Sequence, residues 1–297
     1  QGAVGVSSSR YPEYKDSGIE WVGAVPVHWS VTPLKRLIAR VESGTSVNAI
    51  DVPATDGEYG VLKTSSVYGG EFDIGENKAV VPEEYDRASC PLRAGTIIVS
   101  RMNTPDLVGA AGLVRQVREG IFLPDRLWQV HLSEASPRFI HRWTQSNLYR
   151  AQVQVACSGT SASMQNLAQD QFGAFVLAIP PVIEQTAIAS FLDHETAKID
   201  ALIAEQEKLI ALLKEKRQAV ISHAVTKGLD PKVPMKYSGV EWLGEVPAHW
   251  NIAKCGRYAS VLSGYAFPSS GFSNDENDTR LLRGINVGGK NVLAMRD

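Results

Sequence analysis

The sequence predicts an α+β protein: a β-rich globular domain, then a long helix able to form a coiled coil, then the start of a second, similar domain. Three observations predict this arrangement. A tryptophan-bearing phrase occurs twice, short β-branched runs follow its first copy, and 43 residues without Gly or Pro lie between the copies. We therefore expect domains at residues 11–180 and 229–297, joined by a helix over 181–228.

The repeated phrase reads SGIEWVGAVPVHW over residues 17–29 and SGVEWLGEVPAHW over residues 238–250. Nine of the 13 aligned positions are identical, at an offset of 221 (238 − 17), which indicates an internal duplication. A looser match between residues 61–73 and 281–293 extends it. Around the first copy, two tryptophans, a proline and glycines predict a compact, turn-rich segment over residues 11–30.

The rest of the first domain shows short elements whose type follows from periodicity and from flanking Gly and Pro. The expected elements are a short helix at 34–41, strands at 79–81 and 96–99, a strand pair or tight strand–turn at 107–114, a helix at 138–155, a polar loop at 158–163 and a strand at 172–179.

Residues 183–225 predict one continuous helix of roughly 60 Å, at 1.5 Å per residue. Written in heptads, seven of its ten a and d positions are apolar, which is typical of a coiled-coil seam. Such a stripe cannot be buried by the helix alone, so another helix should cover it. The expected helix-pairing residues are Ile188, Leu192, Ile199, Leu202, Gln206, Leu209, Leu213 and Val220. Lys227 and Gly228 end the helix.

Composition and motifs exclude several classes. Three widely separated cysteines and the lack of a signal-peptide core or an apolar span favour a reducing cytoplasm. The sequence shows no zinc-type cysteine spacing, no Walker loop and no GxGxxG after a strand. Its one tandem proline, in Ile179–Val182, lacks the acid or amide and the aromatic residue that an adenine methyltransferase loop needs. We expect no catalytic residue, metal or cofactor in this chain.

The net charge of −2 conceals a segregation of charge. Residues 10–86 carry 7 Lys and Arg against 13 Asp and Glu, whereas residues 87–150 carry 9 against 4. All nine basic residues of the second segment are arginines, the side chain that forks onto phosphates and guanine edges. Ordinary surface charge that happens to cluster explains the pattern equally well.

Several segments together resemble the specificity subunits of Type I restriction–modification systems. They are YKDSGIEWVGAVPVHWSVTPLKRL (14–37), SGTSASMQNLAQDQF (158–172), and IPPVIEQTAIASFLDHETAKIDALIAEQEKLIALLKEKRQAVISHAVTKGLDP (179–231), followed by the second tryptophan phrase. The family order is recognition domain, helix, recognition domain, helix. This chain ends about sixty residues into the second half, so it resembles a truncated or half-length form, either a gene product or a fragment.

The resemblance implies a non-catalytic subunit that reads part of a bipartite target in double-stranded DNA through target-recognition domains. Its helix would set the half-site distance and dock methyltransferase subunits, two per recognition unit, with a restriction/translocase subunit further off. S-adenosylmethionine would bind the methyltransferase partner. A half subunit could also pair with a second copy through its helix.

Three polar loops are the candidate DNA-binding sites, since polar and basic side chains at strand ends can reach phosphates and base edges. The first contains Lys63, Thr64, Ser65 and Tyr68, with Arg283 and Asn286 in its repeat; the second contains Arg101 and Asn103; the third contains Ser161 and Asn166; Arg126 is an additional candidate. Ordinary turns would look the same. Two other functions stay open: a stand-alone methyltransferase, and an orphan coiled-coil adaptor or inhibitor of methyltransferase subunits that does not read DNA.

Overall fold

The computed structural model describes residues 11–157, 164–273 and 278–279. The chain forms two compact units, Gln1–Lys208 and Leu209–Asp297, and the division falls within one long helix. No helix in the described ranges is both long and apolar enough to cross a membrane.

The centre of the first unit is a four-stranded antiparallel sheet in the order β10-β8-β12-β4. Its strands are β4 (Ile38–Ser43), β8 (Ile97–Ser100), β10 (Ala111–Leu113) and β12 (Leu127–Leu132). Because side chains alternate across a strand, Ile97 and Val99 enter one hydrophobic cluster while Ile98 enters another. The sheet is therefore covered on both faces, which accounts for the continuous apolar run that predicted β8.

A second sheet has the order β11-β6-β7-β5, with β11 parallel to β6 and the other pairs antiparallel. Its strands are β5 (Ala49–Ile50), β6 (Gly60–Leu62), β7 (Asn77–Val80) and β11 (Ile121–Phe122). A Cβ at Gly60 would lie 2.6 Å from Cδ1 of Ile121, so the close approach of these strands requires glycine there. The 3-10 helix η2 (Thr64–Gly70) connects β6 to β7.

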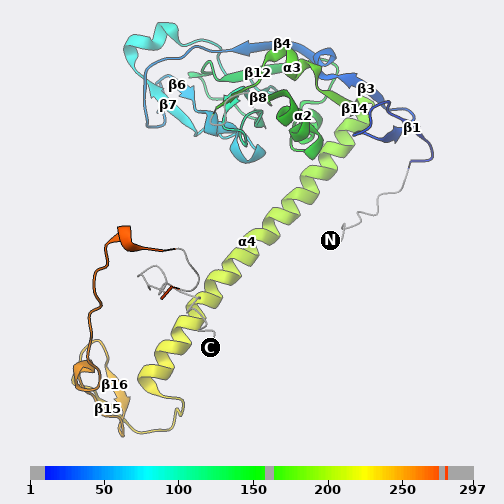
Figure 1. The fold of residues 1–297 in the computed structure, drawn as a ribbon. Helices are drawn as coiled ribbons and strands as arrows, with labels where there is room; N and C mark the ends of the chain where they lie inside the picture. The colour runs from blue at the N-terminus through cyan, green and yellow to red at the C-terminus, as the bar shows by residue number, and fades with distance from the viewer. Residues whose placement is uncertain (1–10, 158–163, 274–277, 280–297) are drawn as a thin grey trace. The chain divides into compact units, whose positions relative to one another are not determined.

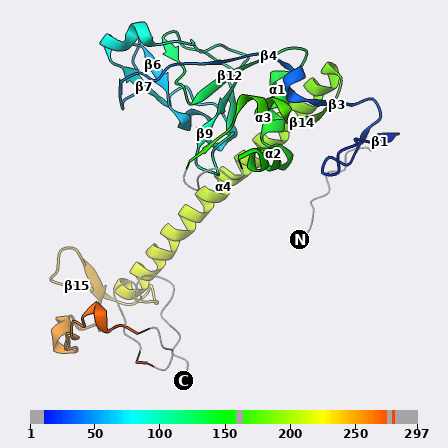
Figure 2. The ribbon, with the colours of Figure 1, turned by 45° about the horizontal axis from the view of Figure 1, so that its top comes forward.

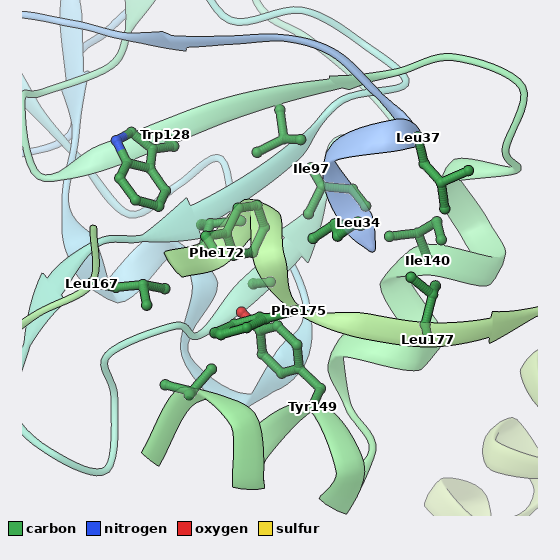
Figure 3. Close-up of a cluster of buried hydrophobic side chains, with 14 of the residues drawn as sticks. Leu34, Leu37, Ile97, Trp128, Ile140, Tyr149, Leu167, Phe172, Phe175 and Leu177 are labelled. Atoms are coloured by element: carbon green, nitrogen blue, oxygen red, sulfur yellow. The ribbon is translucent and has the colours of Figure 1, made fainter. Parts of the chain in front are cut away.

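Three helices pack on the larger hydrophobic cluster: α1 (Pro137–Thr144), α2 (Asn147–Cys157) and α3 (Gln169–Ala174) (Figure 2). Figure 3 shows the aromatic part of this cluster, where Phe172 lies between Trp128 and Phe175, with ring centroids 5.7 Å from each. Two small pairs complete the unit, β9 (Met102–Asn103) with β13 (Gln165–Asn166), and β3 (Ser30–Pro33) with β14 (Val176–Ile179). The remaining 3-10 turns are η1 (Leu34–Arg36), η3 (Pro82–Arg87), η4 (Cys255–Arg257) and η5 (Ser269–Gly271).

Both copies of the tryptophan phrase fold into the same hairpin. In the first unit β1 (Tyr14–Asp16) pairs with β2 (Ala24–Pro26), and in the second β15 (Met235–Tyr237) pairs with β16 (Glu245–Pro247), each register being shifted by the sequence offset of 221. The serine hydroxyl that donates to the carbonyl two residues later recurs as well, at Ser17 and Ser238. The duplication seen in the sequence is thus a duplication of local structure.

The long helix α4 (Val182–Lys227) is unbroken over 46 residues (Figure 1), as its periodicity predicts. Gly228, with φ of +79°, follows its last residue in the left-handed conformation that glycine adopts most easily. Only two residues of α4, Gln185 and Ala189, are buried, and both lie in its first turns.

Three of the expected elements differ from the structure. Residues 34–41 form η1 and the start of β4 instead of a helix, because β12 pairs with Ile38–Ser43. The expected helix at 138–155 is two helices. Residues 107–114, by contrast, form a turn followed by strand β10, which matches the expected strand–turn. The expected strand at 172–179 begins at Val176, since Phe172 belongs to α3.

Candidate nucleic-acid interface

An open depression of about 620 Å³ lies beside η2 in the first unit. Its lining includes the whole first predicted loop together with Arg126, which lies far from that loop in the sequence. The lining residues are Ser46, Val47, Asn48, Ala49, Val61, Leu62, Lys63, Thr64, Ser65, Tyr68, Lys78, Pro124, Asp125 and Arg126. A hollow with hydroxyl, amide and basic side chains offers donors and acceptors of the kind that contact phosphates and base edges.

Two residues of the first loop are engaged by one carboxylate. Nζ of Lys63 lies 3.0 Å from Oε2 of Glu76, and the Ser65 hydroxyl donates to the same oxygen. The hydrogen bond to Glu76 raises the pKa of Lys63, and the bonds from Ser65 and Lys63 lower the pKa of Glu76. Lys63 is therefore protonated and already paired with Glu76.

Tyr68 and Asn103 join the first two predicted loops. Nδ2 of Asn103 donates to the Tyr68 hydroxyl over 2.8 Å and is 3.2 Å from the Ser100 hydroxyl, while its Oδ1 accepts from the backbone N–H of Thr104. The Tyr68 hydroxyl lies 3.1 Å from Oγ1 of Thr64. Asn103 is only 8% exposed, and both its amide N–H groups and its Oδ1 are hydrogen-bonded within the protein, which argues against the direct base contact that the sequence suggested. It holds Tyr68 in place.

Arg101, Arg126 and Asn166 lie along neighbouring chain segments. The Arg101 N–H donates to the carbonyl of Arg126 over 3.0 Å, and β13 places Asn166 opposite Met102. Arg126 and Asn166 are exposed, and neither arginine forms an ion pair with any residue in the described ranges. The neighbouring carboxylate of Asp125 accepts a hydrogen bond from the Ser46 hydroxyl, 2.8 Å, and forms no ion pair with Arg126.

The end of η2 is fastened to α1. Gly69 and Gly70 have φ of +76° and +84°, a backbone that other residues rarely adopt, and the Gly70 carbonyl accepts from Nε2 of His141 (2.6 Å) and Nε2 of Gln145 (2.7 Å). Arg142 of the same helix then reaches Asp193 on α4, with Nη2 2.6 Å from Oδ1. The end of η2 is therefore held by hydrogen bonds from His141 and Gln145, and the helix that carries His141 is itself paired with α4.

The predicted helix-pairing residues divide into two groups. Ile188 packs against the main hydrophobic cluster and Leu192 is half-buried, so the first unit itself covers the start of the stripe. The other six are exposed, from 47% for Leu209 to 58% for Val220 among the apolar ones. The uncovered stripe is Ile199, Leu202, Gln206, Leu209, Leu213 and Val220.

Several site residues were missed or cannot be placed. Sequence reasoning did not select Lys78, Ser46 or Asn48, which line the depression, or Glu76, which pairs with Lys63 of its lining. None of the four belongs to a local motif. Ser161, Arg283 and Asn286 lie outside the described residues. No cluster of His, Cys, Asp and Glu suited to a metal ion occurs within the described ranges.

Comparison with known proteins gives a consistent result. The chain is 24% identical over 172 residues to the Type I restriction enzyme EcoEI specificity subunit of Escherichia coli, covering 57% of this chain and 29% of the relative. It is 24% identical over 250 residues to the EcoKI specificity subunit of Escherichia coli K12, covering 81% of this chain and 50% of that one. The predicted resemblance to Type I specificity subunits is confirmed.

The chain matches at most about half the length of these specificity subunits. No protein-family model matches it. A solved structure concerning complex assembly and conformational transition of the type I R-M system aligns with 73% of this chain and 49% of its own, with a TM-score of 0.53 and 15% identity. At that identity the likeness supports the fold, an α+β unit joined to a long helix, as expected for a Type I specificity subunit.

Proposed function

We propose that the chain is a non-catalytic, sequence-specific DNA-recognition subunit of a Type I-like modification complex. The observation that carries this proposal is the hydrogen bond between Asn103 and Tyr68, which joins two independently predicted loops into one polar surface. The similarity to Type I specificity subunits supports the same function.

The chemistry of the surface suits DNA. Arg101 and Arg126 carry guanidinium groups without an acid partner in the described ranges, and such groups bind phosphate or guanine edges bidentately. Tyr68, Thr64 and Asn166 add hydroxyl and amide groups that can contact base edges or the sugar–phosphate backbone. Asn103 acts behind them as a support.

The helix α4 would act as a spacer and docking element. A straight rod fixes the distance between two reading surfaces, which makes half-site spacing a geometric property. Its exposed stripe would pair with a second copy of this chain or with helices of methyltransferase subunits, two per recognition unit. Those subunits would bind S-adenosylmethionine and carry out methylation, and a restriction/translocase subunit would join the complex. This chain would contribute no catalytic residue.

Binding to double-stranded DNA as a function of salt concentration tests the proposal, with the chain alone and with its methyltransferase partner. We expect weak binding alone, tighter and sequence-dependent binding with the partner, and an affinity that falls steeply with salt because phosphate contacts release counterions. Replacing Arg126 by Gln should reduce the slope of log affinity against log salt by about 0.9, the value for one phosphate contact.

An exposed basic residue outside the surface, Lys198→Gln on α4, is the matched control and should leave the slope unchanged. Binding that is absent or insensitive to salt with the partner present would favour the adaptor instead. Transfer of a labelled methyl group by the purified chain alone would contradict the non-catalytic assignment.

A further inference from the structure

We propose that Glu76 is a specificity-determining residue that holds Lys63 away from DNA phosphates, so that unspecific DNA is bound weakly. The proposal rests on the proposed function, since it concerns the same depression. Glu76 was not selected from the sequence. Its proposed role is to lower the affinity of this surface for DNA phosphates.

The position of Glu76 is fixed by the backbone. Strands β6 and β7 pair Leu62 with Asn77, and the next pair along the ladder keeps a hydrogen bond from the Lys63 N–H to the Glu76 carbonyl, 2.9 Å. The two side chains therefore extend from directly opposed positions, and their charged ends meet at 3.0 Å. The Ser65 hydroxyl donates to the same carboxylate oxygen and orients it.

The ion pair is exchangeable. The side chains of Lys63 and Glu76 are 34% and 38% exposed, and solvent-exposed ion pairs of this kind contribute little to stability. Releasing Lys63 is therefore inexpensive when a phosphate is brought close and held there by other contacts. A loosely held duplex has no such contacts, and for it the carboxylate competes with the phosphate.

A second lysine of the depression is treated in the same way. Lys78 Nζ lies 3.4 Å from Oδ1 of Asp51, whereas Arg126 on the same lining has no acid partner in the described part of the chain. Each lysine is thus paired with an acid, and a lysine ammonium is a point charge with little directional preference. The guanidinium of Arg126, whose hydrogen bonds are directional, remains available to contact DNA. Nonspecific affinity for DNA grows with the number of phosphate contacts. Pairing both lysines with acids therefore lowers this affinity, while the Arg126 guanidinium stays free to make directional hydrogen bonds.

Four variants in a double-mutant cycle test the proposal: wild type, Glu76→Gln, Lys63→Gln, and the two changes together. Binding of each full-length chain to a short random-sequence duplex is measured across a range of salt concentrations. The amide introduced by Glu76→Gln keeps an oxygen for Ser65 and loses the charge that holds Lys63. We expect E76Q to bind more tightly than wild type, with a salt slope steeper by about 0.9, one additional phosphate contact.

The change must act through Lys63. In the K63Q background, E76Q should therefore have no effect on the slope. Glu195→Gln is the matched control, because Glu195 pairs with Lys198 at 2.7 Å on the exposed surface of α4, with 42% and 58% exposed side chains, and the substitution changes the net charge equally. It should bind as wild type does.

An E76Q slope equal to that of wild type, or an E76Q effect of the same size without Lys63, would overturn the role of Glu76 and leave the proposed function intact. Absence of binding by every variant at low salt would overturn the proposed function together with it. Urea unfolding of each variant shows that the comparison is made between folded proteins.

Discussion

The indole N–H of Trp29 donates a hydrogen bond to Oε1 of Glu184, 3.1 Å away, and so ties the first tryptophan phrase to the first turn of α4. His28 Nε2 lies 2.8 Å from Oε2 of the same carboxylate, and the Tyr11 hydroxyl donates to Oε1. Three side chains from one segment converge on one acid. The first tryptophan phrase therefore anchors the start of α4, and its histidine, His28, contributes one of the contacts to Glu184.

Replacing Glu184 by Ala removes the acceptor of all three donors and should lower the free energy of unfolding by about 1–3 kcal/mol. Urea denaturation at pH 7 measures the change. Glu20→Gln, an exposed acid in the same hairpin, is the control, and surface changes of this kind stay within about 0.5 kcal/mol. Equal stability of E184A and wild type would contradict the stabilising role of the contacts to Glu184.

The same carboxylate predicts a pH dependence. Partial burial raises the pKa of Glu184, but the hydrogen bonds from Tyr11, His28 and Trp29 outweigh it, and the net pKa is lowered. A lowered folded-state pKa gives stability that is present above the unfolded value of about 4.3 and is lost as pH falls through the folded value. The stability difference between wild type and E184Q should accordingly shrink below about pH 4, and a difference that grows there would contradict it.

Asp193 is expected to be the main polar link between α1 and α4. It accepts from Nε of Arg142 at 2.8 Å and from Nε of Arg138 at 3.2 Å, and the Arg142 side chain is only 12% exposed. Asp193→Ala should cost about 2–3 kcal/mol of unfolding free energy, since hydrogen bonds to charged groups are lost and the largely buried Arg142 guanidinium loses the nearer of its two acid partners. Asp200→Ala, at an exposed site on the same helix, should be neutral in the same titration.

Replacing Asn103 is predicted to lower the free energy of unfolding, whereas replacing Asn166 is predicted to leave it nearly unchanged. Asn103→Ala removes the part-buried hydrogen bonds to Tyr68 and Thr104 and should lower the unfolding free energy by about 1–3 kcal/mol. Asn166 is exposed, so N166A should change it by less than about 0.5 kcal/mol. Thermal or urea unfolding of the two variants distinguishes a support from a surface contact, and a neutral N103A would contradict the assignment.

The exposed stripe of α4 predicts association. Leu209 and Leu213 are 47% and 55% exposed, so L209K/L213K should not affect folding but should abolish pairing with a second copy or with a methyltransferase subunit. Sedimentation equilibrium at micromolar concentration, with and without the partner, measures it. Lys214→Gln, a neighbouring exposed position, is the control. Identical association of the double variant and wild type would exclude the stripe as the contact.

Local patterns predicted much of the fold. The 3–4 spacing over residues 183–225 depends only on the helix itself, and α4 spans them. The apolar spacing of Leu34, Leu37 and Ile38 also suggested a helix, but Ile38 pairs with Leu132 of β12, and this long-range pairing overrides the local preference. The break between α1 and α2 depends on Ser146, whose hydroxyl accepts from the Tyr149 N–H and starts a new helix.

The candidate interface was predictable only in part. Lys63 and Tyr68 were selected because their polar loop is flanked by apolar strand residues, and Arg126 was an additional candidate. The depression brings the three together. The pairing of Lys63 with Glu76 depends on the register between β6 and β7, which no local pattern specifies. Asn103 had the residue type of a base reader, and only its burial and its hydrogen bonds identify it as a support.

The central claim is that the surface around η2 reads DNA sequence, and the methylated motif tests it most directly. The adenine methylation pattern of the genome is compared between cells carrying the wild-type chain and cells carrying Arg126→Gln or Tyr68→Phe, each with the same methyltransferase. The account predicts a bipartite motif in which one half changes or becomes degenerate in the variants while the other half is kept. Methylation that continues at an unchanged motif in both variants would contradict it.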